Sequence, residues 1–283
     1  MHDLPLPVDG AVPERLEQIL TGQWGQFVQL RRVVLQQFGD EAIHDLRVAS
    51  RRLRTALEAA APCVDQDELR RIWRPIRKVT RELGHLRNLD EARSYFAGLR
   101  QAGLLPLLVT LDKQRRQERR RVKLLLEELP CKRLQRQLEQ VVHRLRTGPG
   151  SEPSRVIGWL SERNQALYRP IHHLLQLPGL AGQAEERHTL RRAIKKWRYF
   201  YELLDRVCGR QQGELVCLLR QYQAVLGDLN DREVFQALLR EAAELPAAVQ
   251  REVASVLCRQ HRVLVTRFRK LLQKQPLNYQ FMV

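Results

Sequence analysis

Apolar residues recur every three or four positions along almost the whole chain. This spacing places them on one face of an α-helix, and no segment shows the strict alternation typical of a half-buried strand. Helix-breaking clusters interrupt the pattern at Leu177-Pro178-Gly179 and, near the middle of the chain, at residues 147–153. The pattern therefore predicts an all-α protein with a linker at 147–153, after which Ser154 would cap the next helix.

The segments on either side of this linker resemble each other, in order and at nearly constant spacing. The matched segments are His44–Arg54 with His188–Arg198, Leu83–Leu86 with Leu226–Leu229, and Arg116–Arg119 with Arg259–Arg262. Because ordered matches at one spacing are hard to obtain by chance, we predict an internal duplication. The fold class expected is all-α, with two helical bundles that arise from this duplication.

The duplication predicts the domain boundaries. They are an N-terminal extension (1–13), a first bundle (14–146), the linker (147–153), a second bundle (154–274) and a C-terminal tail (275–283). Each bundle would hold a long helix, a helix starting near the histidine, a third helix ending at Leu-Gly, and further helices. Glycine would end those third helices, and polar residues would cap the helices that follow, namely Asn88, Asp90, Asn230 and Asp231.

The helix after each histidine has a basic face and an apolar face, since successive residues turn by about 100°. The first basic face holds His44, Arg47, Arg51, Arg54 and Glu58, opposite Leu46, Ala49, Leu53, Ala56, Leu57 and Ala60. The second holds His188, Arg191, Lys195, Arg198 and Glu202, opposite Leu190, Ala193, Trp197, Phe200 and Tyr201. Arg52, Arg192 and Lys196 flank these faces.

A charged helix face is most simply explained by solvation. Solvated faces, however, normally mix signs, whereas here like charges recur three and four residues apart, which destabilises an isolated helix. This repulsion between like charges recurs in both halves. Its recurrence indicates that a bound polyanion relieves the repulsion. The two histidines would then donate hydrogen bonds to phosphate as imidazolium, a form that a nearby anion favours.

Further basic stripes are much richer in the first half. The third helix carries Arg70, Arg74, Arg77 and Arg81 opposite Ile72, Ile76, Val79 and Leu83, but its second-half partner keeps only Arg220. A later run includes Arg116 and Arg119, matched more thinly by Arg259 and Arg262. If packing brings these stripes together, they would line a basic central groove or channel.

Composition supports an anionic partner. The sequence holds 49 Lys and Arg against 32 Asp and Glu, a net charge of +17, and such an excess usually serves nucleic acid, an anionic membrane or polyphosphate. Aromatic residues are only 6%, and several lie on predicted core faces, so base stacking has little support. No secretion signal, membrane-length apolar run or C-x-x-C pair occurs, which predicts a cytoplasmic protein without membrane insertion.

Motifs for catalysis, cofactors and metals are missing from the sequence. It contains no phosphate-binding P-loop, dinucleotide fingerprint or nucleophile elbow, and no His or Cys spacing typical of a metal site. We therefore expect no catalytic residue, no cofactor and no metal, and a binding function rather than an enzyme.

The paired motif H-x-L-R-[VR]-A-x-[RK]-[RK]-x-R, followed by L-G-x-L, resembles the CHAD family (conserved histidine α-helical domain). The resemblance runs from about Glu14 to Gln273. It implies two helical bundles related by a pseudo-twofold, with polyphosphate binding on a basic central surface. It assigns binding to His44, Arg47, Arg51, Arg52 and Arg54, and to His188, Arg191, Arg192, Lys195, Lys196 and Arg198. The third helix of the second half has lost most of its basic residues. This departure argues against an equal contribution of the two halves to binding.

The expected function is thus binding of inorganic polyphosphate by a stand-alone module at polyphosphate granules, because the hydrolase signature E-x-E-x-K of many relatives does not occur. Two alternatives stay open. One is a non-specific nucleic-acid binder, which a basic helical surface also suits. The other is a helical scaffold that coats a granule. The oligomeric state does not follow from the sequence.

Overall fold

The computed structural model describes residues 11–209 and 213–279, which form nine α-helices, two short 3₁₀ helices and no strand. The helices are α1 (Val12–Gln37), α2 (Asp40–Ala59), α3 (Gln66–Gly98), α4 (Leu105–Glu127), α5 (Cys131–Thr147), α6 (Pro153–Leu175), α7 (Ala184–Val207), α8 (Glu214–Glu241) and α9 (Ala247–Lys274). The 3₁₀ helices are Ala102–Leu104 and Leu180–Gly182. The predicted all-α class is confirmed. None of the helices so described is long and apolar enough to cross a bilayer.

The predicted faces of α2 and α3 are confirmed. The whole apolar set of α2, from Leu46 to Ala60, is buried, and so is the set from Ile72 to Leu83 on α3. In α7, Leu190, Trp197 and Phe200 are buried, whereas Ala193 is only half-buried. On α2 and α3 the basic side chains are therefore turned away from the core, as the periodicity indicates, whereas Arg198 on α7 is buried.

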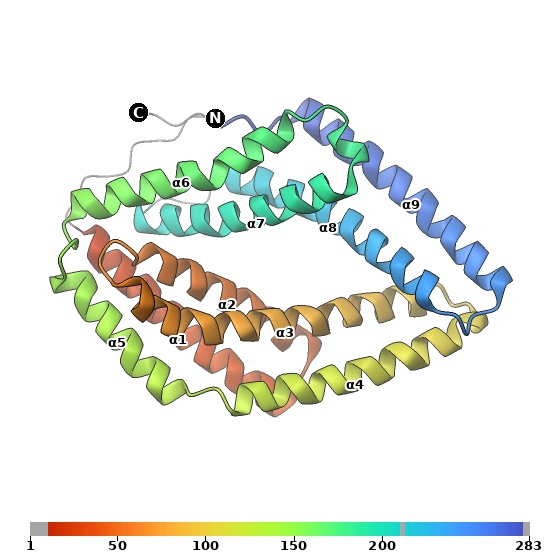
Figure 1. The fold of residues 1–283 in the computed structure, drawn as a ribbon, viewed down its shortest axis with the longest axis horizontal. Coiled ribbons are helices and arrows are strands. Elements are labelled where there is room, and N and C mark those ends of the chain that lie inside the picture. The colour runs from red at the N-terminus through yellow and green to blue at the C-terminus, as the bar shows by residue number, and fades with distance from the viewer. Residues whose placement is uncertain (1–10, 210–212, 280–283) are drawn as a thin grey trace.

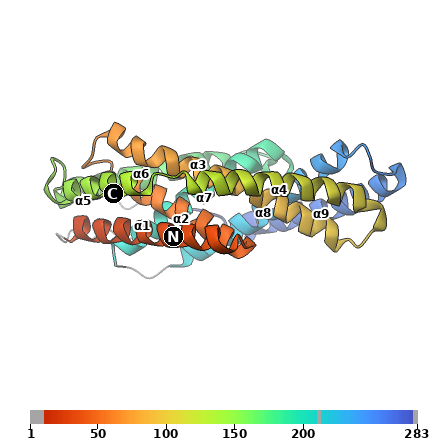
Figure 2. The ribbon, with the colours of Figure 1, turned by 90° about the horizontal axis from the view of Figure 1, so that it is seen from below.

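The helices form a long, thin molecule in which α2 and α7 lie next to each other (Figures 1 and 2). α1, α2 and α3 pack in sequence along one side, and α6, α7 and α8 pack in sequence along the other. At the far end, the α3–α4 turn lies beside the α8–α9 turn (Figure 1). The two motif helices thus meet near the middle of the molecule.

The apolar core is continuous across the predicted halves. Its main cluster runs from Val12 on α1 to Phe268 on α9 and takes side chains from both sides of the α5–α6 turn. A second cluster lies where α3, α4, α8 and α9 meet, and there Tyr95 stacks on Phe235 with ring centroids 4.7 Å apart. This shared core holds α2 and α7 side by side. The duplication stays a prediction from the sequence.

The third helices do not end at Leu-Gly, so that expectation is wrong. α3 continues through Gly84 to Gly98, and α8 continues through Gly227 to Glu241. A glycine inside a helix costs about 1 kcal/mol relative to alanine. Leucines on either side of each glycine are buried, and their packing outweighs that cost. The polar residues after each glycine consequently lie within a helix and cap nothing.

The α5–α6 turn occupies the predicted linker, since α5 ends at Thr147 and α6 begins at Pro153. The N-cap residue of α6 is Glu152 rather than the expected Ser154, which lies inside α6. The turn is packed: the Cys63 thiol donates to the Gly150 carbonyl at 3.2 Å.

The predicted terminal segments are only partly described. Residues 1–10 of the N-terminal extension and 280–283 of the C-terminal tail lie outside the described residues. α1 begins at Val12, within the predicted extension. In the tail, Leu277 and Tyr279 are buried, and the Tyr168 hydroxyl donates to the Leu277 carbonyl at 3.1 Å. This part of the tail therefore belongs to the core.

Candidate functional site

The two motif helices bring their arginines together. Arg47 and Arg51 on α2 interact electrostatically with Arg191 on α7, the arginine of the second motif copy. Arg51 also interacts electrostatically with Tyr199 on α7. We call Arg47, Arg51 and Arg191 the central arginine cluster. It joins residues that are far apart in the sequence and belong to both predicted halves.

The cluster is positively charged and poorly solvated. Burial lowers the pKa of Arg47. Burial, followed by the proximity of Arg47, lowers the pKa of Arg51 to about 10. The Nε atoms of Arg47 and Arg191 are buried without a hydrogen-bond partner among the described residues. None of the three makes an ion pair with a described carboxylate. Because desolvation and like charge both disfavour guanidinium ions, an anion bound here would be strongly stabilised.

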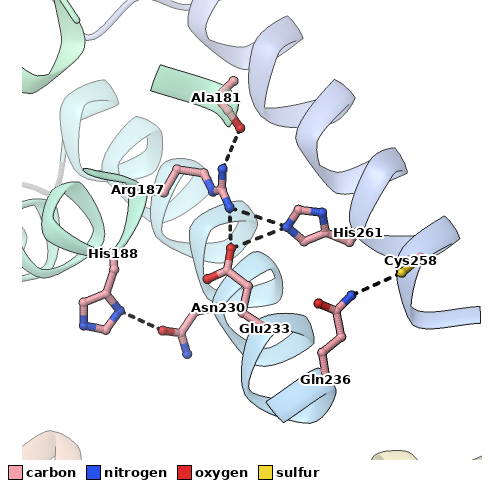
Figure 3. A network of polar contacts seen from close by, with 8 residues as sticks. All are labelled: Ala181, Arg187, His188, Asn230, Glu233, Gln236, Cys258 and His261. Atoms are coloured by element: carbon pink, nitrogen blue, oxygen red, sulfur yellow. Dashed lines mark hydrogen bonds and ion pairs between the residues drawn. The ribbon is translucent and has the colours of Figure 1, made fainter. Parts of the chain in front are cut away.

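Both histidines are exposed at the starts of their motifs. Partial burial and the neighbouring Arg47 lower the pKa of His44, so the ligand-free protein disfavours its imidazolium form. The expected imidazolium would therefore need the charge of a bound anion. His188 Nδ1 lies 3.0 Å from Asn230 Oδ1 of α8 (Figure 3), which orients its ring.

A pocket of about 670 Å³ lies where α2, α3, α6 and α7 meet. Its charged and aromatic walls include Arg54, Trp73, Arg77, Trp159, Arg163 and Lys196. The Arg54 guanidinium lies 4.6 Å from the centre of the Trp73 ring, and that of Arg77 lies 5.2 Å away. We call this the Trp73 pocket. It brings together three predicted binding residues, Arg54, Arg77 and Lys196.

A smaller cavity of about 260 Å³ lies between α1, α2 and α7 and holds Arg52 beside Arg206. Burial, followed by the proximity of Arg52, lowers the pKa of Arg206. Glu202 lines the same cavity, but its carboxylate is already bonded to Arg198 and Arg220.

The family model of the CHAD domain matches residues 18–240, well over half of the chain. The chain belongs to the CHAD domain family. Members of this family are linked to the binding of polyphosphate.

Solved structures agree with this assignment. The crystal structure of the CHAD domain from the plant Ricinus communis is similar with a TM-score of 0.65 and 22% identity, covering 97% of this chain and 91% of that one. PptA from Streptomyces chartreusis is similar with a TM-score of 0.66 and 17% identity, covering 92% of this chain and 99% of that one. These two structures establish the fold. No curated protein matches the sequence.

Several predicted binding residues of this CHAD domain already have partners. Buried Arg198 donates to Glu202 at 2.5 Å and to Gln223 at 2.7 Å, and Arg220 donates to Glu202 at 3.1 Å. Arg81 pairs with Glu82 at 2.7 Å, and Arg119 donates to the Phe38 carbonyl. The remaining predicted residues are exposed or half-buried: Arg74, Arg116, Arg192, Lys195, Arg259 and Arg262.

A structural network supports the second motif (Figure 3). Buried Arg187 on α7 donates to the Ala181 carbonyl at 2.8 Å and pairs with Glu233 on α8. His261 on α9 lies 3.4 Å from the same carboxylate. The network therefore connects α7, α8 and α9 at Arg187, the residue that precedes His188.

An ion pair between α3 and α4 plays a comparable role in the first half. Asp90 pairs with Arg115 on α4 at 2.6 Å, instead of capping a helix as expected. Asp40 at the start of α2 lies 3.6 Å from the same guanidinium. This pair fixes the start of the first motif helix against two other helices.

Sequence reasoning missed Tyr199, Trp73, Glu58 as a cross-helix partner, and Arg163. Trp73 and Arg77 are four residues apart on one helix, a spacing that places them on one face and could have indicated their contact. The other contacts join different helices: Arg163 Nε on α6 donates to Glu58 on α2 at 2.7 Å. No local pattern in the sequence indicates them.

Proposed function

We propose that this CHAD domain binds inorganic polyphosphate across the central arginine cluster, so that one ligand contacts both halves. The observation that carries the proposal is the set Arg47, Arg51 and Arg191, which come from both motif copies and make no ion pair with a carboxylate of the described residues. The Glu91 carboxylate acts on Arg47 electrostatically but pairs with Arg87. A flexible chain of phosphates supplies closely spaced negative charges, and arginine suits phosphate oxygens in geometry and charge.

Non-specific nucleic-acid binding is the less favoured alternative. Proteins that bind single strands without sequence preference usually offer aromatic rings for base stacking. Here Trp197, Phe200 and Tyr201 of the motif helix are buried in the core. Trp73 and Trp159 do line the Trp73 pocket. The Trp73 ring, however, already lies against two guanidinium groups, which favours a ligand that consists of phosphate alone.

We further propose that binding is not accompanied by catalysis and that it serves attachment to polyphosphate granules in the cytoplasm. The pure protein should bind polyphosphate without releasing orthophosphate, which a phosphate assay measures over hours. Steady release that depends on the protein would contradict the binding role. Localisation of a fluorescent fusion to granules, and its loss in cells that lack polyphosphate, tests the attachment.

Competition between polyanions tests the ligand. Labelled polyphosphate bound at moderate salt is challenged with duplex DNA and with single-stranded RNA at equal phosphate concentration. We expect unlabelled polyphosphate to displace the label at much lower concentration than either nucleic acid. Equal displacement by all three would show that the surface binds polyanions without preference.

Substitution in both motif helices tests the surface. Arg51→Ala combined with Lys195→Ala should weaken binding and reduce the salt slope by roughly one to two units, as expected for the loss of two phosphate contacts. Arg133→Ala with Arg136→Ala is the matched control, since these two residues are exposed on α5. An equal slope in both double variants would place the ligand elsewhere.

A further inference from the structure

Arg54 and Arg77 form a like-charged pair that no carboxylate neutralises directly. Both guanidinium groups lie against Trp73, at 4.6 and 5.2 Å from the ring centre. Burial and the proximity of Arg77 lower the pKa of Arg54, and its Nε atom is buried without a partner. Neither arginine makes an ion pair within the described part of the chain. An indole face attracts cations, so the ring holds together two groups that repel each other.

The matching arginines of the second half are neutralised. By the sequence alignment, Arg198 and Arg220 match Arg54 and Arg77. Both donate to Glu202, at 2.5 and 3.1 Å, and this carboxylate is buried. The same alignment matches Trp73 with Val216, which is buried and has no ring to offer. The second half therefore lacks an uncompensated arginine pair at this place.

Glu58, which the alignment matches with Glu202, is used differently. Its carboxylate accepts from Arg163 Nε on α6 at 2.7 Å and lies 3.6 Å from the Lys196 ammonium on α7. Electrostatically it also raises the pKa of Arg54, so it lies close to the arginine pair. Glu58 is thus an acidic group inside a basic pocket, and it faces the space that a phosphate would enter.

We propose that the Trp73 pocket, built mainly on α2 and α3 of the first half, is a phosphate subsite without a counterpart at the matching place around Arg198 and Arg220. Trp73 is the positioning residue that keeps Arg54 and Arg77 together, and Glu58 is an internal competitor that a bound phosphate displaces from Arg163 and Lys196. The inference rests on the proposed polyphosphate binding. It adds an asymmetry, because the polyphosphate would be bound most tightly at one end of the α2–α7 contact. The ligand is a segment of a phosphate chain, recognised by charge.

Removal of the ring tests the positioning role. Trp73→Leu should weaken binding of a defined medium-length polyphosphate roughly threefold to tenfold, since the arginine pair loses its cation–π support. Trp73→Phe keeps an aromatic face and should recover most of the affinity. Thermal unfolding of each variant separates loss of fold from loss of binding. Equal affinities of the wild type, Trp73→Leu and Trp73→Phe would overturn the positioning role.

Removal of the competitor should act in the opposite direction. Glu58→Gln should tighten binding about twofold to fivefold, because phosphate no longer competes with a carboxylate of like charge. Glu17→Gln is the matched control: it also raises the net charge by one, but Glu17 pairs with Arg146 and lies outside the Trp73 pocket. Unchanged or weaker binding by Glu58→Gln, or equal tightening by both variants, would overturn the subsite.

Failure of this inference differs from failure of the proposed function. A wild-type protein that does not bind polyphosphate refutes the function itself. If the wild type binds polyphosphate, and the double substitution Arg51→Ala with Lys195→Ala weakens that binding, the proposed function stands. Trp73→Leu and Glu58→Gln then test only the subsite.

Discussion

At the scale of single residues, Arg51 combines a proposed binding role with a cost to stability. Its pKa of about 10 in the folded protein lies below the ordinary arginine value, chiefly because of burial. The unfolded chain therefore holds this proton more tightly, so the penalty is complete below pH 10 and disappears as the pH rises from there to the ordinary arginine pKa. At neutral pH the charge of Arg51 destabilises the ligand-free fold.

Replacing Arg51 by a neutral side chain of similar length should remove that penalty. Arg51→Met is expected to raise the free energy of unfolding at pH 7.5 by roughly 1–3 kcal/mol without ligand. It should also gain less stability than the wild type from added polyphosphate. Urea unfolding with and without polyphosphate measures both effects. Arg133→Met, at an exposed position on α5, is the control. Destabilisation by Arg51→Met would mean that its contact with Tyr199 outweighs the buried charge.

The predicted binding residues differ in how much of their surroundings can be predicted from the sequence. The basic faces from His44 to Arg54 and from His188 to Arg198 follow from helical periodicity, and the structure places Arg47, Arg51 and Arg191 together. Arg198 has the same spacing but is buried against Glu202. Trp73 lies against Arg54 of another helix. Periodicity gives the face of a residue, whereas packing between helices decides its partners.

At the scale of helices, the sequence predicted the existence and the apolar faces of α2, α3 and α7 but not the length of α3 and α8. Glycine predicts the end of a helix because it has low helix propensity. Buried leucines on both sides, such as Leu83 and Leu86, continue the apolar face past Gly84. Propensity is a weak local effect of about 1 kcal/mol, and tertiary packing readily exceeds it.

These internal glycines predict an increase in stability on substitution. Nothing lies within 4 Å of a Cβ added at Gly84 or Gly227, so alanine fits without a clash. Gly84→Ala and Gly227→Ala should each raise the free energy of unfolding by about 0.5–1 kcal/mol. Urea unfolding measures the change.

A glycine of the α5–α6 turn provides the contrasting case. Gly150 has a φ of 104°, and an added Cβ would lie 2.5 Å from the Pro62 carbonyl oxygen. Gly150→Ala should therefore destabilise the fold by more than 1 kcal/mol, because strain and a backbone clash add together. Lower stability of both helical variants, or a neutral Gly150→Ala, would contradict this account.

At the scale of the whole molecule, a net charge of +17 and the mutual repulsion within the central arginine cluster both oppose the compact state. The continuous core holds it together. α1 of the first half contacts α6 and α7 of the second, and Arg15 donates to the Val207 carbonyl at 3.0 Å. At the other end of the molecule, the aromatic cluster of Tyr95, Phe96 and Phe235 joins α3 of the first half to α8 of the second. The arginines of both halves are thus held together by apolar contacts elsewhere.

This arrangement predicts that the halves do not fold alone, although the sequence favours a boundary at 147–153. Fragments 1–147 and 148–283 would each expose core surface that the intact chain buries against the other half. We expect each fragment to lack a cooperative urea transition, and the intact chain to unfold in one step. Circular dichroism measures both, and mixing the fragments should restore part of the helical signal. A sharp transition of 1–147 alone would instead show that the first half is an autonomous domain, and the first half would then have to hold its basic side chains in place without α7.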